Sequence, residues 1–142
     1  MRRSLLAALL AGIALSVACD NSDGGDTATG PTTVTLTTET FTGSVDPMGS
    51  KFHPFTVAQA GEVDITLTAA GPPSTIFMGL AIGVLSADAA SCTLDSRFTV
   101  VVQAGTTPQI PVSAGTGKYC VQIFDAGNQV ATINYTITVA HP

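Results

Sequence analysis

The chain has 142 residues, of which 45% are hydrophobic, and its 10 acidic residues against 5 basic ones give a formal net charge of −5. This length suits one domain with a hydrophobic core of its own. The acidic balance argues against nucleic acid and anionic lipid headgroups as partners, because both are recognised by basic patches.

The first 18 residues have the three-part pattern of an export signal. Arg2 and Arg3 give a positive start, and residues 5–17 form a mainly apolar run. A membrane-spanning helix needs about 20 apolar residues, so this run is too short to be one. We therefore expect residues 1–18 to be a signal peptide and the protein to be exported.

The end of this segment offers two cleavage sites. Ser16 and Ala18 are small residues of the kind that the general signal peptidase accepts before its cut. Residues 15–19 also resemble the lipobox of bacterial lipoproteins, in which the cysteine thiol receives a diacylglycerol before cleavage. The lipobox usually has a leucine three residues before the cysteine, and here Leu15 stands four before Cys19. The resemblance implies a lipid on Cys19 and a protein anchored to a membrane of the cell envelope.

The cysteine count supports the lipid. The three cysteines are Cys19, Cys92 and Cys120. In an oxidising compartment an odd number leaves one thiol unpaired, whereas a lipid on Cys19 lets Cys92 and Cys120 form a disulfide. A bridge that closes a loop of about 29 residues contributes roughly 3.5 kcal/mol of stability in the chain-entropy model.

A polar segment follows Cys19. Residues 20–33 contain three Asp, three Gly and no large apolar side chain, so they cannot bury a face. We expect residues 19–33 to be a flexible tether and residues 34–142 to be the folded domain. A chain that begins at Cys19 keeps all 10 acidic residues but only three basic ones, so its formal charge becomes −7.

From Val34 onward the hydrophobic pattern has a period of two. Short runs rich in Thr, Val and Ile alternate between apolar and polar residues, and Gly and Pro fall between them, which predicts half-buried strands joined by turns. The run 76–85 is apolar on both faces, which predicts a central strand, and residues 86–92 are compatible with one helical turn. The expected strands lie within residues 34–45, 51–57, 63–69, 76–85, 97–104, 119–124 and 133–139. The pattern predicts an all-β antiparallel sandwich or barrel.

The disulfide has a predicted place in this architecture. Tyr119, Val121 and Ile123 share one face of their strand and read as core residues. Because side chains alternate along a strand, Cys120 is expected to point to the outer face. The bridge to Cys92 would then tie down a surface loop.

Residues with catalytic or metal-binding chemistry are sparse. The only histidines, His53 and His141, do not form a cluster with metal-ligand spacing. No Gly-x-Ser-x-Gly motif is present, and Asp64 and Asp125, in or next to strand-like runs, are more typical of a solvated face than of an acid–base pair. We therefore expect no enzymatic activity, no metal and no cofactor.

Several segments together resemble the bacterial pre-peptidase C-terminal domain family. The similar segments are FHPFTV (residues 52–57), VDITL (63–67), GKYCVQI (117–123) and YTITV (135–139). The resemblance implies a small secreted, non-catalytic β-sandwich of jelly-roll type, and some such domains bind fibrous or polymeric substrates. The family often has an Asp-x-Asp-Leu-like element in its middle strand, where this chain has IFMGL (76–80).

These observations predict a lipid-anchored binding or surface-structural module. The anchor provides the membrane contact, and the expected partner is an unknown protein or an extracellular polymer. With eight Phe and Tyr residues and no Trp, a stacking platform for carbohydrate is less favoured than protein contact. The alternatives are a small envelope enzyme inhibitor, with residues 87–97 as its projecting loop, or a hydrolase with a cleft lined by His53, Asp64 or Asp125.

Overall fold

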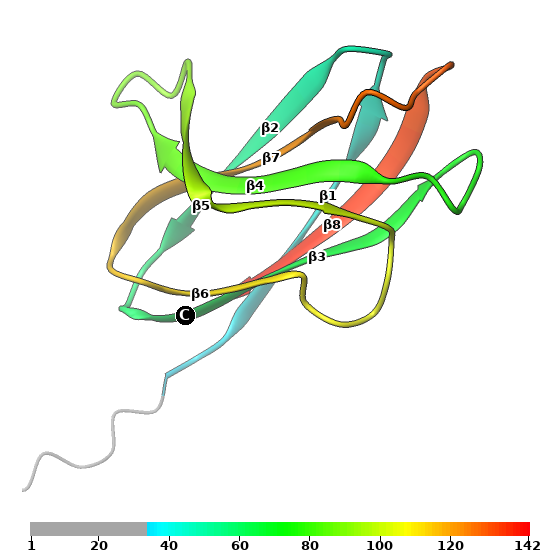
Figure 1. Cartoon of the computed structure of the whole chain (residues 1–142). Coiled ribbons are helices and arrows are strands. Elements are labelled where there is room, and N and C mark those ends of the chain that lie inside the picture. The colour runs from blue at the N-terminus through cyan, green and yellow to red at the C-terminus, as the bar shows by residue number, and fades with distance from the viewer. Residues whose placement is uncertain (1–33) are drawn as a thin grey trace, which may run out of the picture. The chain divides into compact units, whose positions relative to one another are not determined.

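The computed structural model describes residues 34–142. The predicted signal peptide, Cys19 and the tether lie outside the described residues. Within the described part no helix is long and apolar enough to cross a membrane. The ordered elements are strands (Figure 1): β1 (Thr37–Val45), β2 (Ser50–Val57), β3 (Gly61–Gly71), β4 (Met78–Leu85), β5 (Cys92–Val102), β6 (Ile110–Ala114), β7 (Gly117–Asp125) and β8 (Ile133–His141).

The strands form two antiparallel four-stranded sheets, ordered β1-β8-β3-β6 and β2-β7-β4-β5. Every connection except the β4–β5 hairpin passes from one sheet to the other. This strand order is that of an eight-stranded jelly roll, which confirms the predicted all-β antiparallel sandwich. β1 and β2 are edge strands, and so are β5 and β6.

The core lies between the two sheets and follows the predicted alternation. In β8, Ile133, Tyr135, Ile137 and Val139 are buried, and the residues between them are more exposed. In β3, Val63, Ile65 and Leu67 face the same core. β4 is a central strand, as expected, and Gly79 lies beneath the ring of Phe124, which occupies the space of a side chain there.

The structure differs from the sequence prediction at several places, one of which is the start of β5 at Cys92 rather than at residue 97. Strand β6 was not predicted, because it is only five residues long and contains Pro111, which edge strands tolerate. Residues 86–91 form a hairpin turn rather than a helical turn, closed by a 2.9 Å hydrogen bond from Ser86 N to Ser91 O. β1 begins at Thr37, and Val34 and Leu36 before it are exposed.

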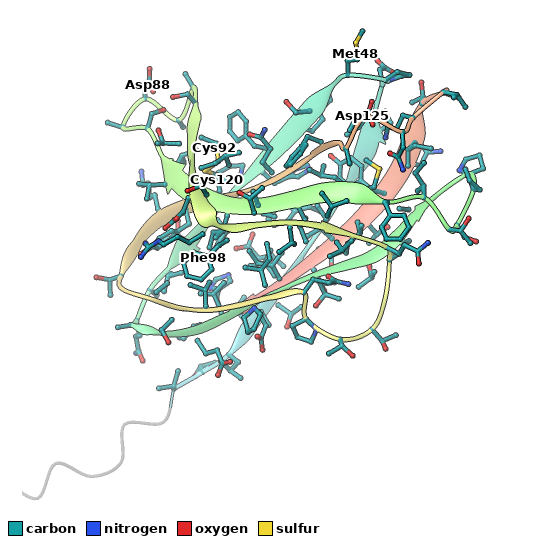
Figure 2. The ribbon with its side chains drawn as sticks, in the orientation of Figure 1. Met48, Asp88, Cys92, Phe98, Cys120 and Asp125 are labelled. Carbon is teal, nitrogen blue, oxygen red and sulfur yellow. A yellow bond between two sulfur atoms is a disulfide. The ribbon has the colours of Figure 1, made fainter. Side chains whose placement is uncertain are left out.

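A disulfide joins Cys92 at the start of β5 to Cys120 in β7, with the two Cα atoms 5.9 Å apart (Figure 2). Cys120 alternates with the core residues Val121 and Ile123 along β7. Its side chain is fully buried but does not belong to the core cluster. The bridge therefore lies on the outer side of β7, where it fastens the β4–β5 hairpin.

Candidate functional site

The side of the sandwich between β5 and β6 is incompletely covered. Phe98, Val100 and Val102 of β5 point toward the core but are only half-buried, as are Val112 and Ala114 of β6. Both strands are sheet edges, so among the described residues no further strand pairs with their outer edges. An apolar groove, which we call the β5–β6 groove, therefore runs between these two edges.

The groove contains a cavity of about 180 Å³. Its walls come from four strands, so chain segments distant in sequence meet here. The lining residues are Ile82, Gly83 and Val84 of β4; Asp95, Arg97 and Phe98 of β5; Val112, Ser113, Ala114 and Gly115 at β6; and Tyr119 of β7. Figure 2 shows Phe98 in the space between the β5 and β6 ribbons.

A bulge in β5 shapes one wall. Ala81 pairs with Thr99 and Gly83 pairs with Leu94, so residues 95–98 of β5 stand opposite a single residue of β4. Bulges bend a strand and redirect its side chains. Gly83 permits the close approach, because a Cβ there would clash with the carbonyl oxygen of Thr93. The bulge thus depends on a glycine in the neighbouring strand.

An ion pair orders the bulge at the mouth of the groove. The Asp95 carboxylate accepts bonds from Arg97 Nη2 at 2.6 Å, Arg97 Nε at 3.1 Å and Arg97 N at 3.0 Å. These bonds lower the pKa of Asp95 below its ordinary value. The guanidinium carbon lies 5.5 Å from the centre of the Phe98 ring, within reach of a cation–π contact. The charges of Asp95 and Arg97 therefore neutralise each other.

Tyr119 forms the opposite wall. Its hydroxyl donates a 3.1 Å hydrogen bond to Gly115 O, in the turn between β6 and β7. Its ring stacks on that of Phe55, with 5.9 Å between the centroids. Both contacts fix the ring, so this wall is preformed and does not depend on a ligand.

The loop between β5 and β6 is hydrogen-bonded to β3. Gly105 N donates to Leu67 O at 2.9 Å, and Gln109 N donates to Ile65 O at 3.0 Å. The side-chain oxygen of Gln109 accepts from Leu67 N at 2.7 Å. The loop therefore continues the sheet edge along β3 beyond the end of β6.

The opposite side of the sandwich, between β1 and β2, is closed around His53, and farther along β2 it has an open hollow of about 340 Å³ lined by Glu39, Pro54, Phe55, Thr56, Leu85 and Lys118. Phe41 of β1 stacks on His53 of β2 at 4.9 Å, and His53 Nε2 shares a 2.8 Å hydrogen bond with the Tyr135 hydroxyl. His141 Nε2 lies 3.0 Å from the Glu39 carboxylate. These contacts fill the gap between the sheets, so the two sides of the molecule differ.

The three residues proposed for a hydrolase do not converge. His53 lies in the closed side, and Asp64 alternates with the core residues Val63 and Ile65, so it faces outward from the other sheet. Asp125 accepts hydrogen bonds from four backbone amides: Met48 N at 2.8 Å, and the amides of Gly127, Asn128 and Gln129 at 2.8 to 3.2 Å. These bonds, that from Met48 foremost, lower the pKa of Asp125. Its role is to join the β1–β2 turn to the β7–β8 loop (Figure 2).

The segment proposed for an inhibitor is only partly a loop. Residues 86–91 form the hairpin turn, with Asp88 at its tip (Figure 2), whereas Cys92 to Arg97 belong to β5. Asp88 Oδ1 accepts from Ser86 Oγ at 2.6 Å and from Ala90 N at 3.2 Å. The turn is therefore well ordered and is braced by the disulfide that follows it.

Sequence reasoning placed Phe98 and Tyr119 on strands but did not bring them together. The signal for β6 was the alternation of Ile110, Val112 and Ala114, which is short and contains Pro111. Among residues 34–142 no three His, Cys, Asp or Glu side chains are grouped so that they could hold a metal ion. No protein-family model matches the chain, and no curated protein matches it.

Proposed function

We propose that the protein is an exported, lipid-anchored, non-catalytic component of the bacterial cell envelope that binds a protein partner through the β5–β6 groove. The export pattern and the cysteine count support the anchor. The observation that supports binding is the groove itself, where two edge strands present half-buried apolar side chains around a cavity of about 180 Å³. Exposed apolar surface of this kind is typical of interaction sites.

A protein partner suits the groove better than a polysaccharide does. Carbohydrate sites often use an exposed aromatic face for stacking, as aromatic side chains offer a flat apolar surface. Here the Tyr119 ring already stacks on Phe55, and Phe98 lies beneath Arg97. The aliphatic lining by Val84, Val112 and Ala114 is better suited to the side chains of a protein.

Site-specific photocrosslinking tests this function. The photoreactive residue benzoylphenylalanine is introduced at Val112, which lines the cavity, or at Pro111, which is exposed on the outer face of the same strand and does not line it. Both variants are expressed in the native bacterium and irradiated in intact cells. We expect a discrete protein adduct from position 112 and none from position 111. Equal labelling at both positions, or an adduct with polysaccharide, would contradict a protein-binding groove.

An envelope enzyme inhibitor is the second candidate, and the observation that favours it is the braced turn of residues 86–91. A rigid projecting turn is the feature that lets an inhibitor occupy an enzyme cleft at small entropic cost. Inhibition assays with purified envelope proteases test it. Replacement of Asp88 by Ala would remove two of the bonds that order the turn and should weaken any inhibition.

A further inference from the structure

The four edge strands are protected to different degrees. Edge strands avoid unwanted pairing through Lys, Pro or bulges, or by being short. β2 contains Lys51 and Pro54, and β6 is short and contains Pro111. In β5 the bulge ends at Phe98, and residues 99–102 continue with neither Lys nor Pro. This part of β5 pairs with β4 on one side, and its other edge adjoins the groove.

The remaining edge strand, β1, does not combine a free edge with space for added apolar side chains. It contains neither Lys nor Pro, but its inward side chains are already occupied. Phe41 stacks on His53, and Val45 is buried. A strand added to β1 would gain backbone hydrogen bonds without an apolar groove for its side chains. Residues 99–102 of β5 offer a free edge, and their half-buried side chains Val100 and Val102 follow Phe98, which lines the cavity.

The spacing of the half-buried side chains matches an extended peptide. Phe98, Val100 and Val102 follow one another at every second position of β5. Same-face side chains of an extended chain are roughly 7 Å apart, so a peptide lying beside β5 presents its alternate side chains at the same interval. Its inward side chains would lie beside Val100 and Val102 and extend toward the cavity that Phe98 and Val112 line.

The charge near the groove favours a basic segment. Arg97 is the only basic residue in β5 or β6, and Asp95 neutralises it. On the outer face of the next strand, β3, Glu62 and Asp64 are register partners of Ser113, which lines the cavity, and of Pro111. Lys118 lies on β7, two strands away from β5, and does not line the cavity.

Two other occupants fit less well. Residues 20–33 lie outside the described structure, but they contain no large apolar side chain and include three Asp. They therefore lack the groups that would fill the groove. A second copy of this chain would bring the same excess of negative charge against the carboxylates described above.

We propose that the exposed edge of β5 accepts an extended, basic segment of a partner protein as an added strand, whose alternate apolar side chains enter the β5–β6 groove. This inference rests on the proposed function, in which the groove binds a protein. Strand addition is a known mode of peptide recognition, with affinity from main-chain hydrogen bonds and specificity from alternate side-chain pockets.

Designed peptides test this inference on the full-length exported protein. The probe is a labelled ten-residue peptide of alternating Val and Thr with a pair of Lys at each end, measured by fluorescence anisotropy. The comparison peptides replace Lys by Glu, place the Val residues consecutively, or N-methylate alternate backbone amides. We expect each change to weaken binding at least tenfold, and added salt to weaken binding of the Lys-flanked probe.

Two variants of β5 form a matched pair. Val100→Lys places a charge in the groove, and Val101→Lys places the same charge on the opposite face of the same strand, where Val101 is exposed. The first should weaken binding at least tenfold and the second less than twofold. Hydrogen exchange of the native protein gives a readout that needs no variant: the probe should slow exchange in residues 99–102 and leave β1 unchanged.

The outcomes separate this inference from the proposed function. Equal binding of the Lys-flanked and Glu-flanked probes, or of the N-methylated probe, would overturn the basic added strand. Absence of probe binding would also overturn it, while a crosslink at position 112 would keep the protein-binding groove. Absence of both would remove the two proposals together.

Discussion

The surroundings of His53 determine how the stability of the protein changes with pH. The ring lies between Phe41 and the Tyr135 hydroxyl, within the closed side of the sandwich. Burial lowers the pKa of His53 below 6.5, and the nearby charge of Lys51 lowers it further. Both causes disfavour the protonated ring in the folded state.

We therefore predict that the protein loses stability as the pH falls below about 6.5. In this range the unfolded chain, with an ordinary histidine pKa, binds the proton more readily than the folded chain, so the free energy of unfolding decreases as the pH falls toward the lower folded pKa. The pKa values of Asp88, Asp95 and Asp125 are also lowered, but from 3.8, so their effect belongs to a more acidic range.

Urea unfolding of the native protein and of His53→Gln at pH 7 and pH 5 measures this effect. Glutamine can still bond the Tyr135 hydroxyl but does not titrate. We expect the loss of stability between the two pH values to be smaller in the variant. An equal loss in both proteins would show that another group dominates.

At the scale of the strands, the β5 bulge depends on Gly83. An added methyl group there meets the backbone of Thr93 rather than a movable side chain, so the β4–β5 pairing must shift. Overpacking of this kind costs roughly 1–3 kcal/mol. We predict that Gly83→Ala lowers the free energy of unfolding by about this amount and deforms the groove.

Gly115→Ala is the matched control, because a Cβ at Gly115 meets no atom within 4 Å. Chemical denaturation should show a change within about 0.5 kcal/mol for this variant, as for ordinary surface substitutions. If the two alanine variants were equally stable, Gly83 would not limit the approach of β5 to β4.

Core strands such as β3 and β8 could be predicted from the sequence, but the β5–β6 groove could not. Val63, Ile65 and Leu67, like Ile133 to Val139, alternate over enough residues for the period of two to be read directly. β6 has only three inward positions, one of them alanine, and Pro111 interrupts the pattern. Because β6 is not predicted, the sequence does not indicate which strand edge lies opposite β5.

The bulge in β5 could not be predicted from the sequence for a related reason. Residues 95–98 depart from pairing because of the backbone approach at Gly83, about twelve residues earlier in the chain. The alternation of side chains within one strand does not show how closely a neighbouring strand approaches it. The candidate site lies where topology brings β4, β5, β6 and β7 together, so it depends on long-range contacts that a periodic pattern cannot specify.

At the scale of the whole molecule, the negative charge would oppose membrane attachment and the proposed anchor would favour it. A chain that begins at Cys19 has a formal charge of −7, which repels an anionic membrane surface. Membrane attachment therefore needs acyl chains, each buried CH₂ of which contributes about 0.8 kcal/mol, and more than one chain gives stable anchoring. The proposed lipid on Cys19 would supply them.

We predict that Cys19→Ala moves the protein from the membrane fraction to the soluble envelope fraction or the medium, with no change in the unfolding of the sandwich. Fractionation with a salt wash measures attachment, and intact mass of the native protein should show a chain that starts at Cys19 with added acyl mass and gains two hydrogens on reduction. An unmodified native chain, cleaved after Ala18, would contradict the anchor. Because Cys92 and Cys120 form their disulfide without Cys19, the groove and its proposed partner would then belong to a freely secreted protein.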